Sequence, residues 1–115
     1  MNRYGTMSQE LLAKAQEALA DGDLIQASEK GWGAAAQAAK AVAEARGWPH
    51  NNHGALFQIV NRLSAETSDP RLRELFLAAS SLHQNFYEHW MPVESVATGV
   101  QTVGELVAKL EPLAQ

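Results

Sequence analysis

The stretch that decides the fold is residues 29–53, which read EKGWGAAAQAAKAVAEARGWPHNNH. Its first half is poor in bulky side chains and rich in Ala and Gly, so a helix there can approach a neighbouring helix closely. The helical pattern begins near Leu24 and ends at Arg46. Gly47-Trp48-Pro49 then breaks it, because proline lacks the amide proton that a helix interior needs. We expect a long helix, a short loop and a new helix that starts near His53.

Helical periodicity also appears in four other parts of the chain, and strand-like alternation of apolar and polar residues is nearly absent. The apolar faces of the five expected helices lie within residues 11–19, 24–42, 56–63, 72–86 and 93–110. Thr6, with Gln9 three residues on, predicts the start of the first helix as a capping box. We therefore predict one all-α domain over residues 1–115. Its architecture is an antiparallel up-and-down bundle of four main helices plus a short extra one.

Three short segments predict the turns between these helices. Gly22 supplies a left-handed position and Asp23 caps the next helix, so the first two helices form an antiparallel hairpin. Ser68-Asp69-Pro70 ends one helix and starts another, with Asp69 as the cap. Met91-Pro92 interrupts the last long pair of helices.

Composition limits the classes of function. Only 9 residues are Lys or Arg and the formal net charge is −4, whereas nucleic-acid-binding domains usually carry a basic face. We expect no extended duplex DNA binding, although a contact to one or two phosphates stays open. The chain has no Cys, so disulfides and thiolate metal sites are impossible. Because neither a signal peptide nor a run of about 18 apolar residues is visible, we expect a cytoplasmic protein without membrane contact.

The first candidate site is the helix junction with Arg46, His50, Asn52 and His53. Histidine exchanges protons near neutral pH, and a guanidinium can hold a phosphate by two hydrogen bonds. Arg46 and His53 therefore form a candidate RNA-cleaving pair, in which His53 is the base and Arg46 stabilises the phosphorane. His50 and Asn52 would support them. In the structural alternative, Arg46 closes its helix, His50 and Asn52 are loop residues, and His53 opens the next helix.

The second candidate group lies near the end of the fourth helix. His83 and Tyr87 are four residues apart and share a face, which suggests a binding role. The structural alternative places Phe86 and Trp90 in the core, with Tyr87 hydrogen-bonded at its rim. No zinc-type spacing of His and carboxylates occurs, so we expect neither a metal nor another cofactor.

Lys30 and Trp32 on the second helix form the third candidate. Trp32 either fills the volume that its small neighbours leave, forms a dimer contact or stacks on a base. The Gly and Ala row of the second helix and the Val row of the fifth offer more flat apolar surface than one short bundle easily covers. We therefore expect a homodimer, for which a partner protein could substitute.

Several segments carry a family resemblance over roughly residues 11–110. They are Ala20-Asp21-Gly22-Asp23, the run 27–35 (ASEKGWGAA), Gly47-Trp48-Pro49-His50 and the run 82–88 (LHQNFYE). With them the chain resembles the HEPN superfamily and, within it, the small PaREP-like helical proteins. The resemblance implies a helical bundle that pairs as a dimer. Many members are RNases of toxin–antitoxin or defence systems, and others bind a nucleotidyltransferase. Catalytic members carry Arg followed by His after four to six residues, a spacing that Arg46 and His53 match.

Two functional hypotheses follow. The preferred one is a non-catalytic interaction module that acts as a dimer or with a nucleotidyltransferase or antitoxin partner. The alternative is a metal-independent RNase that uses Arg46 and His53 on RNA. The acidic charge, and the position of this pair between the second and third helices, favour the first hypothesis. The Arg–His spacing favours the second.

Overall fold

The computed structural model describes residues 2–115, which form five α-helices and one 3-10 helix. In chain order these are α1 (Arg3–Ala20), α2 (Leu24–Arg46), α3 (His53–Thr67), α4 (Arg71–Glu88), α5 (Val93–Leu110) and η1 (Glu111–Ala114). No strand occurs among the described residues. The prediction of an all-α bundle is confirmed.

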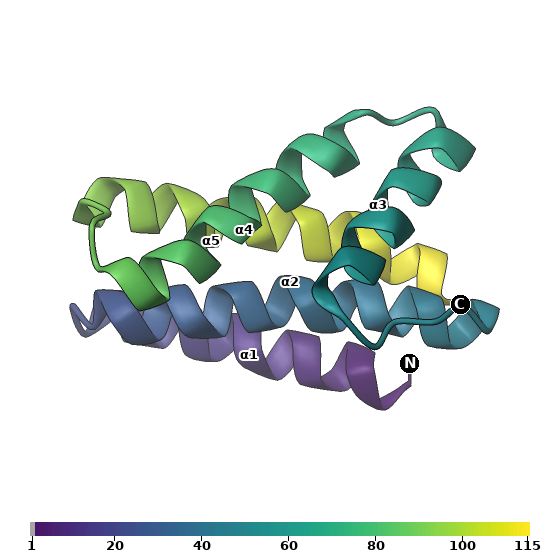
Figure 1. The fold of residues 1–115 in the computed structure, drawn as a ribbon. Helices are drawn as coiled ribbons and strands as arrows, with labels where there is room; N and C mark the ends of the chain where they lie inside the picture. The colour runs from purple at the N-terminus through teal and green to yellow at the C-terminus, as the bar shows by residue number, and fades with distance from the viewer. Residues whose placement is uncertain (1) are drawn as a thin grey trace.

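The long helices alternate in direction around α2. Figure 1 shows α1 and α4 running one way, and α2 and α5 running the other. α2 contacts each of the other α-helices, whereas α3 packs mainly against α4. α3 has 15 residues and is the shortest of the α-helices, and it leans away from the bundle axis (Figure 1). It is therefore the extra helix, which the sequence alone did not identify.

The small side chains of α2 serve packing inside the chain. Ala34, Ala35 and Ala39 are fully buried, and Val96 and Val103 of α5 are buried as well. The Ala and Val rows thus leave no surplus surface for the homodimer that they were expected to form. That argument is wrong, although the dimer itself stays a prediction.

Leu82 of α4 depends on two glycines of neighbouring helices. A Cβ atom at Gly31 of α2 would lie 3.0 Å from Leu82 Cδ1, and one at Gly99 of α5 would lie 2.7 Å from Leu82 Cδ2. The Leu82 side chain has no exposed surface. The three helices therefore meet at a point where a Cβ atom at Gly99 would force Leu82 to shift, and where one at Gly31 would press tightly on the same side chain.

The first helix begins earlier than expected. Asn2, and not Thr6, caps α1, because its Oδ1 accepts a hydrogen bond from the Gly5 amide at 3.1 Å. Asn2 Nδ2 also donates to the carbonyl oxygen of Ala41 at 2.9 Å, which ties the start of α1 to α2. This contact between distant parts of the chain favours Asn2 over the local Thr6 and Gln9 pattern.

The other turns follow the expected chemistry. Gly22 adopts a φ of 78°, and Asp23 accepts a hydrogen bond from the Gln26 amide at 3.1 Å. At the start of α4, Pro70 and not Asp69 takes the cap position, although Asp69 Oδ1 accepts from the Arg71 amide at 3.1 Å. Ser68 also ends α3 in the left-handed region, with a φ of 54°.

A buried polar network fixes the end of α4. Asn85 is 1% exposed, and its Nδ2 donates to Ser28 Oγ of α2 at 2.9 Å. Its Oδ1 accepts hydrogen bonds from the amides of Trp90 and Met91 at 2.9 and 2.7 Å. The Asn85 side chain thus provides the hydrogen-bond acceptor for two backbone amides between α4 and α5, and it joins this turn to α2.

Candidate functional site

Three helices bring aromatic rings and two histidines together. The Trp32 ring of α2 lies 5.0 Å from the rings of both His53 at the start of α3 and His83 of α4, measured between centroids. The two imidazoles are 5.4 Å apart with 26° between their planes. Phe57 adjoins His53, and Tyr87 adjoins His83, each at 5.3 Å. We call Trp32, His53, Phe57, His83 and Tyr87 the aromatic face.

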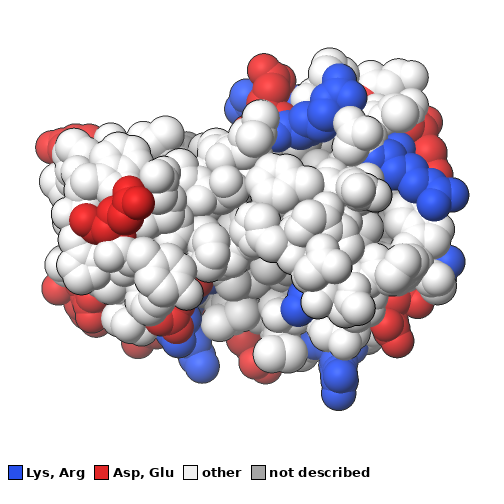
Figure 2. All heavy atoms as spheres, viewed as in Figure 1, with Lys and Arg blue, Asp and Glu red and all other residues white. Residues whose placement is uncertain are grey.

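The aromatic face has a rigid floor and an open outer side. Phe76, which has no exposed surface, lies 5.4 Å from Trp32 and 4.8 Å from Phe57. By contrast, Tyr87 is 70% exposed, and the nearby Leu77 is 61% exposed. Figure 2 shows a broad area without charged side chains in the middle of the view, with both acidic and basic groups around its edge. Large exposed apolar side chains such as Leu77 and Tyr87 are typical of contact sites.

The surroundings of His83 in the aromatic face favour its neutral form. Burial lowers the pKa of His83 below its usual range, and the positive charge that His53 carries when protonated lowers that pKa further. Among residues 2–115, no carboxylate lies within ion-pair distance of His53 or His83. Nothing nearby therefore compensates a second positive charge.

Arg46 and His50 have partners of their own, away from these rings. Arg46 Nη1 pairs with Glu66, and its guanidinium lies 5.1 Å from the Trp48 ring, which Arg62 covers at 4.0 Å. His50 Nε2 lies 3.0 Å from Glu44 Oε2, and its ring packs edge-on against Tyr4 at 5.2 Å.

The remaining members of the first and third candidate groups also have local partners. Asn52 caps α3, since its Oδ1 accepts from the Ala55 amide at 2.8 Å. Lys30 Nζ lies 3.2 Å from Glu29 Oε1. The structure thus brings His53, His83, Trp32 and Tyr87 together, whereas Arg46, His50, Asn52 and Lys30 contact other residues.

The structural alternative for the end of α4 is partly wrong. Trp90 is 52% exposed and lies outside the core, whereas Asn85 is buried and its Oδ1 accepts a hydrogen bond from the Trp90 amide. Tyr87 is also far more exposed than a residue at the rim of the core.

Sequence reasoning missed the groove that adjoins the aromatic face. It is about 320 Å³ in volume and runs between α3 and α4. Its lining includes Phe57, Phe76, Leu77 and Arg73. Leu77 breaks the buried row of α4, and this departure from the pattern was the available signal.

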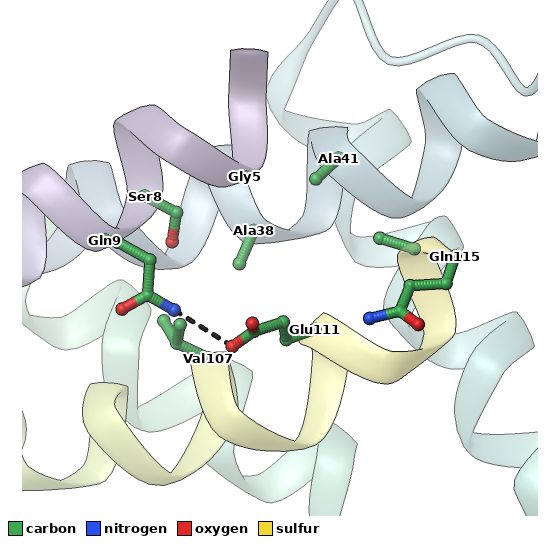
Figure 3. A pocket seen from close by; sticks show the side chains of 9 residues that line it. Gly5, Ser8, Gln9, Ala38, Ala41, Val107, Glu111 and Gln115 are labelled. Atoms are coloured by element: carbon green, nitrogen blue, oxygen red, sulfur yellow. Dashed lines mark hydrogen bonds between the residues drawn. The ribbon is translucent and has the colours of Figure 1, made fainter. Parts of the chain in front are cut away.

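A more enclosed cavity lies elsewhere, between α1, α2, α5 and η1 (Figure 3). Gln9 Nε2 donates to Glu111 Oε2 at 3.1 Å across it, and Ala38 and Ala41 line the α2 side. Its volume is about 40 Å³, which suits one or a few water molecules. It is too small for a substrate.

Two further features concern metal binding and membranes within residues 2–115. No group of three or more His, Cys, Asp or Glu side chains in this range could hold a metal ion. No helix in the same range is long and apolar enough to cross a membrane.

Comparison with known proteins identifies the family. The profile of the archaeal PaREP1/PaREP8 family matches residues 3–107. The chain belongs to this family. The PaREP part of the resemblance seen in the sequence is thereby confirmed.

A solved structure has the same fold. The crystal structure of a protein from Sulfolobus solfataricus superposes with a TM-score of 0.81 at 24% identity, covering 95% of this chain and 97% of that one. No curated protein matches the chain.

Proposed function

We propose that this PaREP1/PaREP8 family member is an HEPN-like interaction module that acts in the cytoplasm by binding a protein through its aromatic face. The partner is a second copy of the chain or another protein, such as a nucleotidyltransferase or an antitoxin. The observation that carries the proposal is the exposure of Tyr87 and Leu77 on the helix that also carries the buried Phe76, which lines a groove together with Leu77. Aromatic anchors of this kind dominate the binding energy of protein interfaces.

The placement of the basic residues also supports binding over catalysis. A phosphodiester-cleaving site needs a cation beside its base, yet Arg46 pairs with Glu66 while His53 lies among rings. The histidines of the aromatic face contact Trp32 from α2 and Phe57 from α3, which are groups that bury apolar surface.

The test is capture of the partner from the native host by tagged protein. Leu77→Asp places a charge in the centre of the exposed apolar surface, so we expect it to remove the captured protein. Met7→Asp is the matched control, because Met7 is also an exposed apolar residue (43%) but lies on α1. Equal capture by the wild type and by both variants would contradict the proposal.

One observation favours the RNase alternative in a changed form. His53 and His83 are neighbours, and two imidazoles at an open surface can act as a general acid and a general base. RNA cleavage by the purified protein in EDTA, lost in His53→Ala and in His83→Ala, would support this function. Cleavage that survives in both variants would rule out the histidine pair.

A further inference from the structure

The groove between α3 and α4 combines an apolar floor with one positive charge. Val60 and Phe76, which line it, are 1% and 0% exposed, so its floor is part of the core. Leu77, which is 61% exposed, also belongs to the lining. Arg73 is the one charged side chain of residues 2–115 that lines the groove. The groove therefore offers apolar surface and a cation together.

Arg73 is held beside this groove by a contact across the two helices. Its Nη1 donates a hydrogen bond to Asn61 Oδ1 of α3 at 3.2 Å. A guanidinium has five N–H donors, so this contact leaves donors for another acceptor. No carboxylate of residues 2–115 lies within ion-pair distance of Arg73. The charge is thus positioned, but no ion pair within the described chain compensates it.

The acidic side chains around the start of α4 lie outside the groove. Glu74 directly follows Arg73 and is exposed, but it is not part of the lining. It lies three residues after Arg71, which places these two on one side of α4. Glu105 and, more weakly, Glu74 raise the pKa of the Arg71 guanidinium. Asp69 is paired with a lysine of α5. The groove itself therefore presents the charge of Arg73.

We propose that the partner protein presents an acidic side chain to Arg73 and an apolar side chain to Leu77 and the floor of the groove. This inference rests on the proposed function, because it names the chemistry of the partner at that site. Arg73 and Leu77 are four residues apart, which is about 6 Å along α4. The acidic and apolar residues of the partner are therefore separated by about two residues in an extended segment, or by about four in a helix.

A carboxylate fits this position better than a neutral or cationic group. Hydrogen bonds between a guanidinium and a carboxylate are charge-assisted and often bidentate, and they are about twice as strong as neutral ones. A partner that covers Leu77, one turn away, also removes water from Arg73. Without a carboxylate from the partner, the loss of hydration would leave the Arg73 charge uncompensated. A basic residue at this place would be repelled.

The test is selection of short random peptides, displayed on phage, against the purified full chain. We expect peptides that bind the wild type to carry Asp or Glu at the stated spacing from an aromatic residue or Leu. The best peptide, synthesised with a fluorescent label, should bind about ten times more tightly than its version with the acid replaced by the corresponding amide. This difference should disappear in Arg73→Gln, and Arg73→Glu should select peptides with Lys or Arg at that place.

Arg62→Glu is the matched control. Arg62 is also an exposed cation near this end of the bundle, but it lines a different groove, so its reversal should keep the preference for acidic peptides. Circular dichroism confirms that each variant is folded. An equal loss of this preference in Arg62→Glu and Arg73→Glu would overturn the inference, because it would show an effect of general charge.

Leu77→Asp separates failure of this inference from failure of the proposed function. If Leu77→Asp abolishes binding of peptides that the wild type binds equally well with the acid or its amide, the acidic partner is refuted and the interaction module stands. If the library yields no peptide whose binding depends on Leu77, both are contradicted.

Discussion

The imidazole rings of His53 and His83 lie 5.4 Å apart, although they belong to different helices and no carboxylate of the described residues pairs with either. Trp32 contacts both rings from a third helix. This relationship makes the aromatic face sensitive to protonation, because a charge on one imidazole opposes a charge on the other.

We expect the free energy of unfolding to decrease as the pH falls below about 6.5. Burial lowers the pKa of His83 in the folded protein, so the unfolded chain takes up the proton first. The stabilising contribution of His83 is thus complete above the pKa that His83 has in the unfolded chain. It is lost as the pH falls toward the lower pKa of His83 in the folded protein. Urea denaturation at pH 7.5, 6.5 and 5.5 measures it. His83→Gln should reduce the change of the free energy of unfolding with pH. His89→Asn, at an exposed position, should leave that change as in the wild type. An equal pH dependence in the wild type and in His83→Gln would contradict the role given to His83.

Gly99→Ala and Gly104→Ala should change stability in opposite directions, although both lie in α5. At Gly99 the added Cβ would lie 2.7 Å from the buried Leu82, and such overpacking costs about 1–3 kcal/mol. At Gly104 the Cβ would meet nothing within 4 Å, so the higher helix propensity of Ala should stabilise the protein by up to about 1 kcal/mol. Thermal unfolding of the two variants gives the comparison. A gain in both would show that Leu82 can move aside.

Asn85→Ala should destabilise the protein by about 2–4 kcal/mol. It removes the acceptor for the amides of Trp90 and Met91, and it leaves the buried Ser28 hydroxyl without its donor. Chemical denaturation measures the loss. Gln84→Ala, at an exposed neighbouring position, is the control and should have little effect. A loss no larger than that of the control would mean that water replaces the network.

Ser68→Gly should stabilise the protein by about 1 kcal/mol, because Ser68 adopts a φ of 54°, which costs a residue with a Cβ atom and costs glycine nothing. Ser80→Gly provides the control, since the same change inside α4 should destabilise the helix. Melting temperatures of the two variants should move in opposite directions. A lower value for Ser68→Gly would instead indicate that the flexibility gained by the unfolded chain dominates.

The helices and most of their boundaries follow from the sequence alone. Gly22, Gly47 and Pro92 act through local backbone chemistry, so their effect does not depend on the rest of the chain. The N-terminal boundary was misplaced because Asn2 is held by a hydrogen bond to Ala41, a contact that no local pattern reveals. The Ala-rich face of α2 predicted close packing against another helix, but it did not predict which helix that would be. Small Ala and Gly residues can pack closely against any apolar helix face, so they do not specify the neighbour.

Only the tertiary structure decided which candidate residues meet. Arg46 and His53 are close in sequence and suggested a pair, but Glu66 holds Arg46, while the start of α3 carries His53 to Trp32 and His83. The sequence determined that α4 has a buried row, because helical periodicity is local. The exposure of Leu77 and Tyr87 depends on where α3 and α2 stop covering α4, and that is set by the packing of the whole bundle.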